Sequence, residues 1–235
     1  MRIFVAGASG VIGRVLVGQL VGAGHDVTGT TRSHERTAAL EAAGAEPVVV
    51  DAFDRHGLIA AVVGARPEVV IHQLTDLTTP PGQAIGDAEL SRNARLRQEG
   101  TANLVDAVAA AGTRRLIAQS IAWLYADGPP PFTEDDPLLP PEPTGAVPTR
   151  RAVSTLERLV TSDPRFEGVV LRYGRLYGPG TWSDTPPQPP TLSVEAAARA
   201  ALLAVDHGEP GIYNVVDDDG PVTNDKARSL LAWSP

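Results

Sequence analysis

Short apolar runs alternate with longer stretches of helical periodicity over the first 120 residues of the chain. Such runs are typical of parallel strands that are buried on both faces by helices. The predicted strands are residues 3–6, 26–30, 47–50, 69–72 and 116–120. The predicted helices are residues 11–21, 35–43, 55–63 and a long one over 87–111. Right-handed crossovers between them give an α/β fold with a doubly wound parallel sheet.

Two proline-rich segments interrupt this alternation in the second half of the chain. Residues 128–148 carry eight prolines and residues 184–190 carry four more. Neither segment forms a helix or a central strand, because proline fixes φ and lacks an N–H donor. Each is either a surface linker or a lid over the carboxyl ends of the strands. The remaining pattern predicts helices at 150–161 and 194–205, and strands at 169–172 and 212–216.

Composition narrows the class of protein. The chain is 43% hydrophobic and 20% charged, which is typical of a globular protein, and its net charge of -8 argues against nucleic acid as a partner. There is no cysteine, which excludes disulfides and zinc–thiolate sites, and we expect no metal. No apolar run approaches the roughly 20 residues of a membrane span. The apolar stretch at the start of the chain is too short for the apolar region of a signal sequence. We therefore expect a cytoplasmic protein with a small-molecule substrate and no membrane partner.

A glycine-rich turn follows the first predicted strand and opens the first predicted helix. Gly7 permits the tight turn, Gly10 lets the backbone approach a pyrophosphate, and Gly13 lets the helix pack against the strand. The free N–H groups of the helix then face the phosphates. This strand–turn–helix context predicts a Rossmann-type dinucleotide site. The expected contacts come from Gly7, Ser9, Gly10, Val11, Ile12 and Gly13.

Further motifs resemble those of the extended short-chain dehydrogenases, also called the NAD-dependent epimerase/dehydratase family. They lie at residues 69–72, 99–104, 119–125, 171–180 and 211–215, and so cover nearly the whole chain. The resemblance implies one NAD(P)-binding domain over residues 1–235. Its small C-terminal substrate lobe is expected near 174–195 and 211–235.

The end of the second predicted strand bears on the choice of nucleotide. An acidic residue there favours NAD, whereas this chain has Arg32, followed by Ser33 and His34. A guanidinium suits the 2′-phosphate of NADP, which we expect as the cofactor. NAD stays open if Arg32 is solvated or stacks on adenine. The resemblance adds Asp51 at the adenine, and Gln73 and Leu74 near the cofactor ribose. His72, just before them, is interpreted as a packed core residue.

The catalytic motif of the resembling family is absent. Its Tyr-x-x-x-Lys occurs nowhere in the chain, and the single lysine is Lys226. An alignment on Glu157 puts Thr149 at the tyrosine position and Val153 at the lysine position. In this family the tyrosine exchanges a proton with the substrate oxygen, and the lysine lowers the pKa of that tyrosine. The chain is thus expected to be an atypical member.

Ser120 and Tyr125 are the candidate catalytic residues. Ser120 either reaches the site by a one-residue bulge or satisfies backbone groups at the strand end. Tyr125 either acts as the proton donor or packs under the proline-rich segment. Arg97 stands where the family often has asparagine, and it is the nearest candidate for a positive charge beside that phenol.

Three functions remain compatible with these residues. The first is an NAD(P)-dependent reductase or dehydrogenase, the second a family epimerase or dehydratase, and the third a non-catalytic NADP sensor or scaffold. The short lobe predicts a small or apolar substrate near Trp123, Tyr125, Tyr177 and Trp182. We also expect a homodimer that pairs through helices 87–111 and 150–161, unless their stripe residues Leu104, Val108, Leu156 and Val160 pack on the sheet instead.

Overall fold

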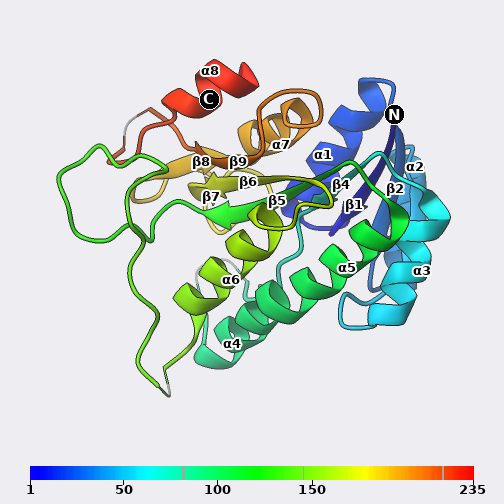
Figure 1. Cartoon of the computed structure of the whole chain (residues 1–235), viewed down its shortest axis with the longest axis horizontal. Helices are drawn as coiled ribbons and strands as arrows, with labels where there is room; N and C mark the ends of the chain where they lie inside the picture. Colours follow the sequence, from blue (N-terminus) through cyan, green and yellow to red (C-terminus); the bar gives the residue numbers. More distant parts are fainter. Residues whose placement is uncertain (81–82, 145, 219) are drawn as a thin grey trace.

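The computed structural model describes residues 1–80, 83–144, 146–218 and 220–235. Seven strands form one sheet in the order β3-β2-β1-β4-β5-β6-β9, and every neighbouring pair is parallel (Figure 1). The predicted doubly wound parallel sheet is confirmed. Its strands are β1 (Arg2–Ala6), β2 (Asp26–Thr31), β3 (Glu46–Val49), β4 (Val69–His72), β5 (Arg115–Ile121), β6 (Glu167–Tyr173) and β9 (Gly211–Val215).

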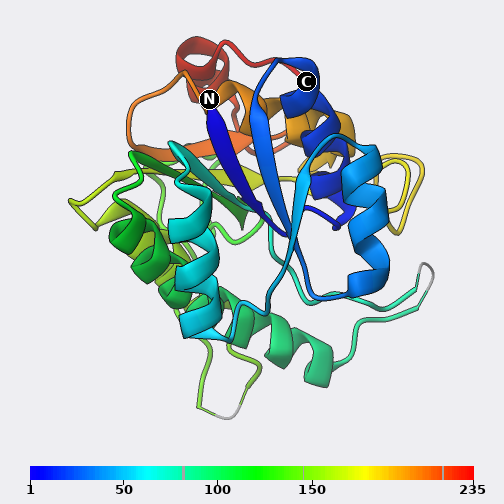
Figure 2. The ribbon, with the colours of Figure 1, turned by 90° about the vertical axis from the view of Figure 1, so that its right-hand side faces the viewer.

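Helices cover both faces of the sheet (Figures 1 and 2). One face packs against α1 (Val11–Gly22), α2 (Thr37–Ala42), α7 (Val194–Leu203) and α8 (Asp225–Leu231). The other packs against α3 (Arg55–Ala65), α5 (Thr101–Ala111) and α6 (Thr149–Thr161), with α4 (Asp87–Arg95) beside α6. Because side chains alternate along a strand, Ile3 and Val5 of β1 enter the first core and Phe4 and Ala6 enter the second.

Side chains fix where two of the helices begin. Asp54 Oδ1 accepts a hydrogen bond of 3.0 Å from the N–H of Gly57 at the start of α3. Ser193 Oγ accepts one of 3.1 Å from the N–H of Ala196 at the start of α7. These N-caps satisfy donors that would otherwise lack a partner in the first helical turn.

The order of the strands reverses between β1 and β4. From β1 the chain winds outward to β2 and β3, and from β4 it winds the other way to β5, β6 and β9. Ala6 pairs with His72 at the carboxyl ends of these two strands. In open parallel sheets the crevice at such a reversal is where ligands bind.

Several segments differ from the sequence prediction. The helix expected at 35–43 begins as a 3₁₀ turn, His34–Arg36, before α2. The helix expected at 87–111 contains a π-helical turn, Leu96–Gly100, between α4 and α5. Residues 211–215 form β9 of the main sheet rather than part of a separate lobe. Within 174–195 the strands β7 (Arg175–Tyr177) and β8 (Thr191–Ser193) pair in a small second sheet.

The four residues proposed for a dimer interface lie in the core of the single chain. Leu104, Val108, Leu156 and Val160 are each at most 1% exposed and pack together against the sheet. The alternative interpretation of this stripe is therefore the one that the fold favours. The homodimer stays a prediction, and light scattering of the purified protein measures it.

Candidate active site

The glycine-rich turn after β1 is tightly packed. Gly7 has a φ of +91°, and a Cβ on it would lie 2.8 Å from the carbonyl carbon and oxygen of Gln73. A Cβ on Gly13 would collide with the carbonyl oxygen of Gly7. At Gly10 such a Cβ meets the Gly7 oxygen at 3.2 Å and no other atom of the described residues within 4 Å. The turn thus holds α1 close to β1 and leaves open backbone beside Gly10.

The N-terminus of α1 supplies donors to this open side. The helix has 12 residues, and no side chain caps it at Gly10. The N–H groups of the first turn have no acceptor within the helix, and Gly10, Val11 and Ile12 line a groove at this point. Backbone donors and the partial positive charge of the helix end suit the diphosphate of a dinucleotide. Ser9 stands beside them and donates from Oγ to Thr31 Oγ1 at 3.3 Å.

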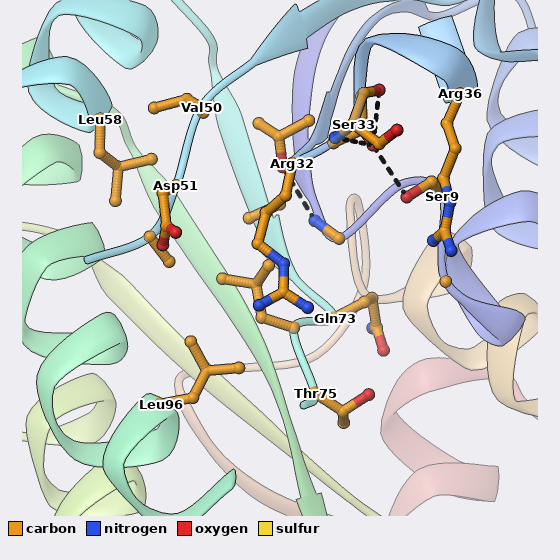
Figure 3. Close-up of a pocket in the computed structure, with 17 residues that line it drawn as sticks. Ser9, Arg32, Ser33, Arg36, Val50, Asp51, Leu58, Gln73, Thr75 and Leu96 are labelled. Carbon is orange, nitrogen blue, oxygen red and sulfur yellow. Dashed lines mark hydrogen bonds between the residues drawn. The ribbon is translucent and has the colours of Figure 1, made fainter. Parts of the chain in front are cut away.

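A cavity of about 260 Å³ lies past the carboxyl ends of β1, β2 and β3. Figure 3 shows Asp51 on one side of it, Ser9 and Arg36 on the other, and Arg32 between them. Asp51 Oδ1 accepts a hydrogen bond of 2.9 Å from the N–H of Phe53, which fixes its carboxylate at the rim. All the cofactor residues predicted near the adenosine line this cavity.

Two arginines, rather than one, border the cavity. Arg32 is 53% exposed, and its guanidinium forms an ion pair of 3.2 Å with Asp76, which also pairs with Arg92 at 3.5 Å. Arg36 lies at the end of the 3₁₀ turn that follows Ser33, and it is exposed. Sequence reasoning missed Arg36. Helical spacing gave no signal for it, because Ser33 between the two arginines is extended, with φ -120° and ψ 126°.

Ser33 and His34, the two residues that follow Arg32, differ in position relative to the cavity. Ser33 lines the cavity, but its Oγ accepts a hydrogen bond of 3.2 Å from the N–H of Glu35 and so caps the 3₁₀ turn. His34 is not among the residues that line the cavity. Ser33 is therefore the one of these two residues that borders the cavity.

Gln73 and Leu74 lie where the cavity continues past β4. Gln73 Nε2 donates to the Tyr173 hydroxyl at 3.2 Å, while Gln73 Oε1 is buried without a hydrogen-bond partner among the described residues. A buried acceptor of this kind costs free energy unless a donor reaches it. A ribose hydroxyl or a carboxamide of a bound dinucleotide would supply one. Together with the open backbone at Gly10, this acceptor indicates that the residues fit NAD(P).

Three adjoining cavities form one continuous groove along the carboxyl edge of the sheet. The cavity near Arg32 shares Gly10 and Gln73 with a second one of about 310 Å³. The second shares Gln119 and Trp182 with a third of about 520 Å³. The loop of residues 74–80 and residues 83 and 85 supply much of the wall, together with Pro187 of the second proline-rich segment. No described residue of 128–148 lines the groove, so this segment does not cover it.

Ser120 lies at the carboxyl end of β5 and lines the third cavity. It is 1% exposed, and its Oγ donates to Glu157 Oε1 at 2.7 Å. Glu157, on α6, also forms a buried ion pair of 2.8 Å with Arg172 of β6. Ser120 is therefore a wall residue whose hydroxyl hydrogen is already donated to a carboxylate.

Tyr125 does not join Ser120 in the cavity. Its hydroxyl donates to Asn214 Oδ1 at 2.6 Å and accepts from the Arg172 guanidinium at 2.9 Å. Its ring stacks on Phe132 of the proline-rich segment at 5.3 Å. Burial raises the pKa of Tyr125 in spite of the neighbouring Arg172. The assignment of Tyr125 as proton donor is therefore corrected, because its hydroxyl is enclosed in a separate cluster, with Arg172 rather than Arg97 as its cation.

The positions of the missing Tyr-x-x-x-Lys motif show no substitute acid. Thr149 lines the third cavity at the start of α6, and Val153 is fully buried. Lys226 lies on α8, where its Nζ donates to the carbonyl oxygen of Ile212 at 2.8 Å. Tyr173 lines the cavity, and burial raises its pKa far above the ordinary value. A phenol that holds its proton this firmly is a weak acid at neutral pH.

His72 and Arg97 are two further titratable groups below the groove. His72 is fully buried, shares a hydrogen bond of 2.9 Å with Thr101 Oγ1 and accepts one from the Leu74 N–H. Burial and the nearby Arg97 lower the pKa of His72 to about 4, so it is a neutral core residue, as predicted. Arg97 is 7% exposed and lines the third cavity.

The sheet, the glycine-rich turn at its reversal point and the groove define a protein of the dinucleotide-binding class. A family model for the NAD dependent epimerase/dehydratase family matches residues 3–209. The chain belongs to this family, whose model covers most of its length.

Relatives extend the comparison. A 3-diazoavenalumate denitrifying reductase of Streptomyces sp is 44% identical over 93% of this chain and 77% of its own length. A 4-hydroxy-2-methyl-3-oxo-4-farnesyl-3,4-dihydroquinoline-1-oxide ketoreductase of Stigmatella aurantiaca is 31% identical over 98% of this chain and 71% of its own. The solved structure of the Bordetella bronchiseptica enzyme WbmG in complex with NAD superposes with a TM-score of 0.74 and 20% identity, covering all of this chain and 88% of that one. At 20% identity, this similarity to a solved structure shows the shared fold alone.

Among the described residues, none of the helices has the length and apolar character needed to cross a membrane. Within the same residues, no group of three or more histidine, aspartate or glutamate side chains is placed to hold a metal ion.

Proposed function

We propose that the chain is an NADP(H)-dependent reductase that delivers hydride to a small, largely apolar substrate in the third cavity. Bound NADPH would supply the hydride. The chain itself would hold the diphosphate on the N-terminus of α1, hold the 2′-phosphate between Arg32 and Arg36, and keep water from the substrate with the apolar walls of the cavity. The 44% identity to a reductase supports this choice within the family.

The observation that carries the proposal is the contrast between a complete nucleotide groove and an absent proton relay. Thr149 and Val153 stand where the family has its tyrosine and lysine, Tyr125 is enclosed elsewhere, and the Ser120 hydroxyl is bonded to Glu157. Reduction of a ketone needs both a hydride and a proton, whereas other hydride acceptors need no proton from the protein.

Replacement of a diazonium group by hydride is a reaction of this second kind. The hydride brings the electron pair of the new C–H bond, and the electron pair of the C–N bond leaves with N₂. The balance is one aryl diazonium ion and one NADPH to one arene, one N₂ and one NADP⁺, with no proton transferred. The name of the Streptomyces relative describes loss of nitrogen from a diazo compound, and this supports the same chemistry here.

The test compares two panels of substrates under NADPH and under NADH. Aryl diazonium salts and aromatic ketones are each incubated with the protein, and coenzyme oxidation and product are followed. We expect NADPH oxidation with the diazonium panel, and deuterium at the former C–N carbon when the coenzyme carries deuterium at its hydride position. An enzyme-free reaction is the control for direct chemical reduction. If NADPH is oxidised with neither panel, the reductase proposal is contradicted, and turnover without net coenzyme change identifies an epimerase or dehydratase instead.

A further inference from the structure

The third cavity combines apolar walls with one buried cation. Its volume is about 520 Å³, and Ile85, Ile121 and Leu176 are among its walls. Arg97 enters it from the long helix and is only 7% exposed. A buried guanidinium is costly unless an anion or hydrogen-bond acceptors face it.

No acceptor for the Arg97 guanidinium is found among the residues that the structure describes. The acid that influences it most is Glu157, and this carboxylate accepts from Arg172 and from Ser120 at 2.7–2.9 Å instead. Glu157 and Arg172 neutralise each other, so Arg97 is left as an unmatched positive charge. Burial lowers the pKa of Arg97 to about 10, which still leaves it cationic at neutral pH. His72, the other titratable group packed near it, is neutral.

A second arginine of the cavity is already satisfied. Arg175 donates from its Nη1 to the carbonyl oxygens of Gln188 at 3.3 Å and Pro189 at 3.0 Å, and its guanidinium lies 5.1 Å from the centre of the Trp123 ring. Of these two arginines, Arg97 is therefore the one whose N–H donors have no acceptor among the described residues.

The local helix geometry also marks the position of Arg97. The π-helical turn Leu96–Gly100 interrupts an otherwise α-helical segment at this residue. Such turns are rare, and they occur frequently at functional sites. A wide turn redirects the side chains that it carries, and here one of them is the cation of the cavity.

We propose that the cavity selects a largely apolar substrate that bears a carboxylate, and that Arg97 pairs with this carboxylate and determines the specificity. A guanidinium matches a carboxylate with two parallel hydrogen bonds. Arg97 lines the third cavity and not the second, whereas Gln119 lines both. The anion would thus lie away from the coenzyme, and the reacting carbon would extend toward Gln119. This placement rests on the proposed function, whereas recognition of the anion does not.

Equilibrium binding of a paired probe tests the proposal. The protein is saturated with NADP⁺ and titrated by calorimetry with 2-naphthoate and with 2-naphthamide, which have the same ring system with and without the negative charge. We expect the carboxylate to bind at least about tenfold more tightly, the lower end for a charged hydrogen bond. Arg97→Met should abolish this preference, and Arg97→Lys should retain part of it. The matched control is Arg95→Met, which removes the same charge from the exposed face of the same helical segment.

Folding and cofactor binding are measured on every variant. Arg97→Met should keep its NADP⁺ affinity and its melting temperature, because the cation it loses has no protein partner among the described residues. Equal binding of the two probes by the wild type overturns the proposal, as does a preference that survives in Arg97→Met or that vanishes in Arg175→Met alone. If Arg97→Met unfolds, the wild-type and Arg97→Lys titrations still decide. A carboxylate preference without any NADPH oxidation refutes the proposed reductase and leaves the anion site standing.

Discussion

The preference for NADP over NAD is the prediction with the most direct structural basis. Arg32 and Arg36 border the nucleotide cavity on the side of β2, where an acidic residue would repel a 2′-phosphate. Replacing either arginine by alanine removes one cation from this side. Replacing both leaves Ser33 as the hydroxyl donor beside that position.

The expected loss of NADP⁺ affinity depends on how exposed the arginine is and on the ion pair that it must give up. A hydrogen bond to a charged group contributes roughly 1.5–3 kcal/mol. Arg32 is 53% exposed and must give up its ion pair with Asp76, so solvent screening and this competition reduce its contribution to about 1.4 kcal/mol, or tenfold in affinity. We expect a similar loss for Arg36→Ala and about a hundredfold loss for the double variant. Asp76→Asn should strengthen NADP⁺ binding severalfold, because it frees Arg32 from its ion pair, and the second arginine that loses this partner, Arg92, is itself exposed.

Calorimetric titration with NADP⁺ and NAD⁺ measures these effects. NAD⁺ affinity is the internal control, because it should change by less than about twofold in each arginine variant if the arginines contact only the 2′-phosphate. The difference between the two nucleotides should also shrink as salt rises, since exposed charges are screened. Equal affinity of the wild type for both nucleotides, or equal losses for both in the variants, would refute the reasoning.

Three further predictions concern the turn, the enclosed tyrosine and the buried histidine. Gly13→Ala should abolish NADP⁺ binding in calorimetry because its Cβ meets the Gly7 oxygen, whereas Gly18→Ala on the same helix should bind normally. Tyr125→Phe should lower the free energy of unfolding by about 1–3 kcal/mol in urea titrations through two lost hydrogen bonds. Its turnover should stay within about twofold, and a drop of about 10²–10⁴-fold would restore Tyr125 as the acid. Stability should fall by roughly 3 kcal/mol from pH 6.5 to about 4, because the unfolded chain protonates His72 there and the folded chain does not. Urea titrations at both pH values should show this loss in the wild type and a smaller one in His72→Gln.

Most of the sheet could be predicted from the sequence because parallel strands are buried on both faces and appear as continuous apolar runs. The predicted and observed bounds of β4 agree at Val69 and His72, and the other strands differ by at most two residues at either end. The glycine-rich turn was predictable for the same reason, since its backbone demands are local. The π-helical turn at Arg97 could not be predicted, because hydrophobic periodicity does not distinguish such a turn from the α-helix on either side of it.

The catalytic side of the groove was harder to predict because it depends on contacts between distant segments. Tyr125 follows β5, and that position suggested a place near the substrate. Its hydroxyl instead bonds to Asn214, 89 residues further along, and its ring stacks on Phe132. The sequence motif at the end of β5 gives no indication of either partner. Glu157 likewise contacts both Ser120 and Arg172, on two different strands.

The missing proton relay and the unmatched Arg97 fit one kind of substrate when the charges are considered together. Hydride transfer to a ketone creates an oxyanion that must be protonated, and Tyr173, the tyrosine that lines this cavity, is a weak acid because burial raises its pKa. Hydride transfer to a diazonium ion neutralises a positive charge instead, so no oxyanion develops. A cation of that kind would be repelled by Arg97 in a cavity of low polarity. A carboxylate on the same molecule removes the conflict, because it pairs with Arg97 and lets the diazonium end lie toward Gln119. The loss of the tyrosine and lysine and the presence of a buried arginine are then two consequences of one requirement, a substrate that carries an anion at one end and an electrophile at the other.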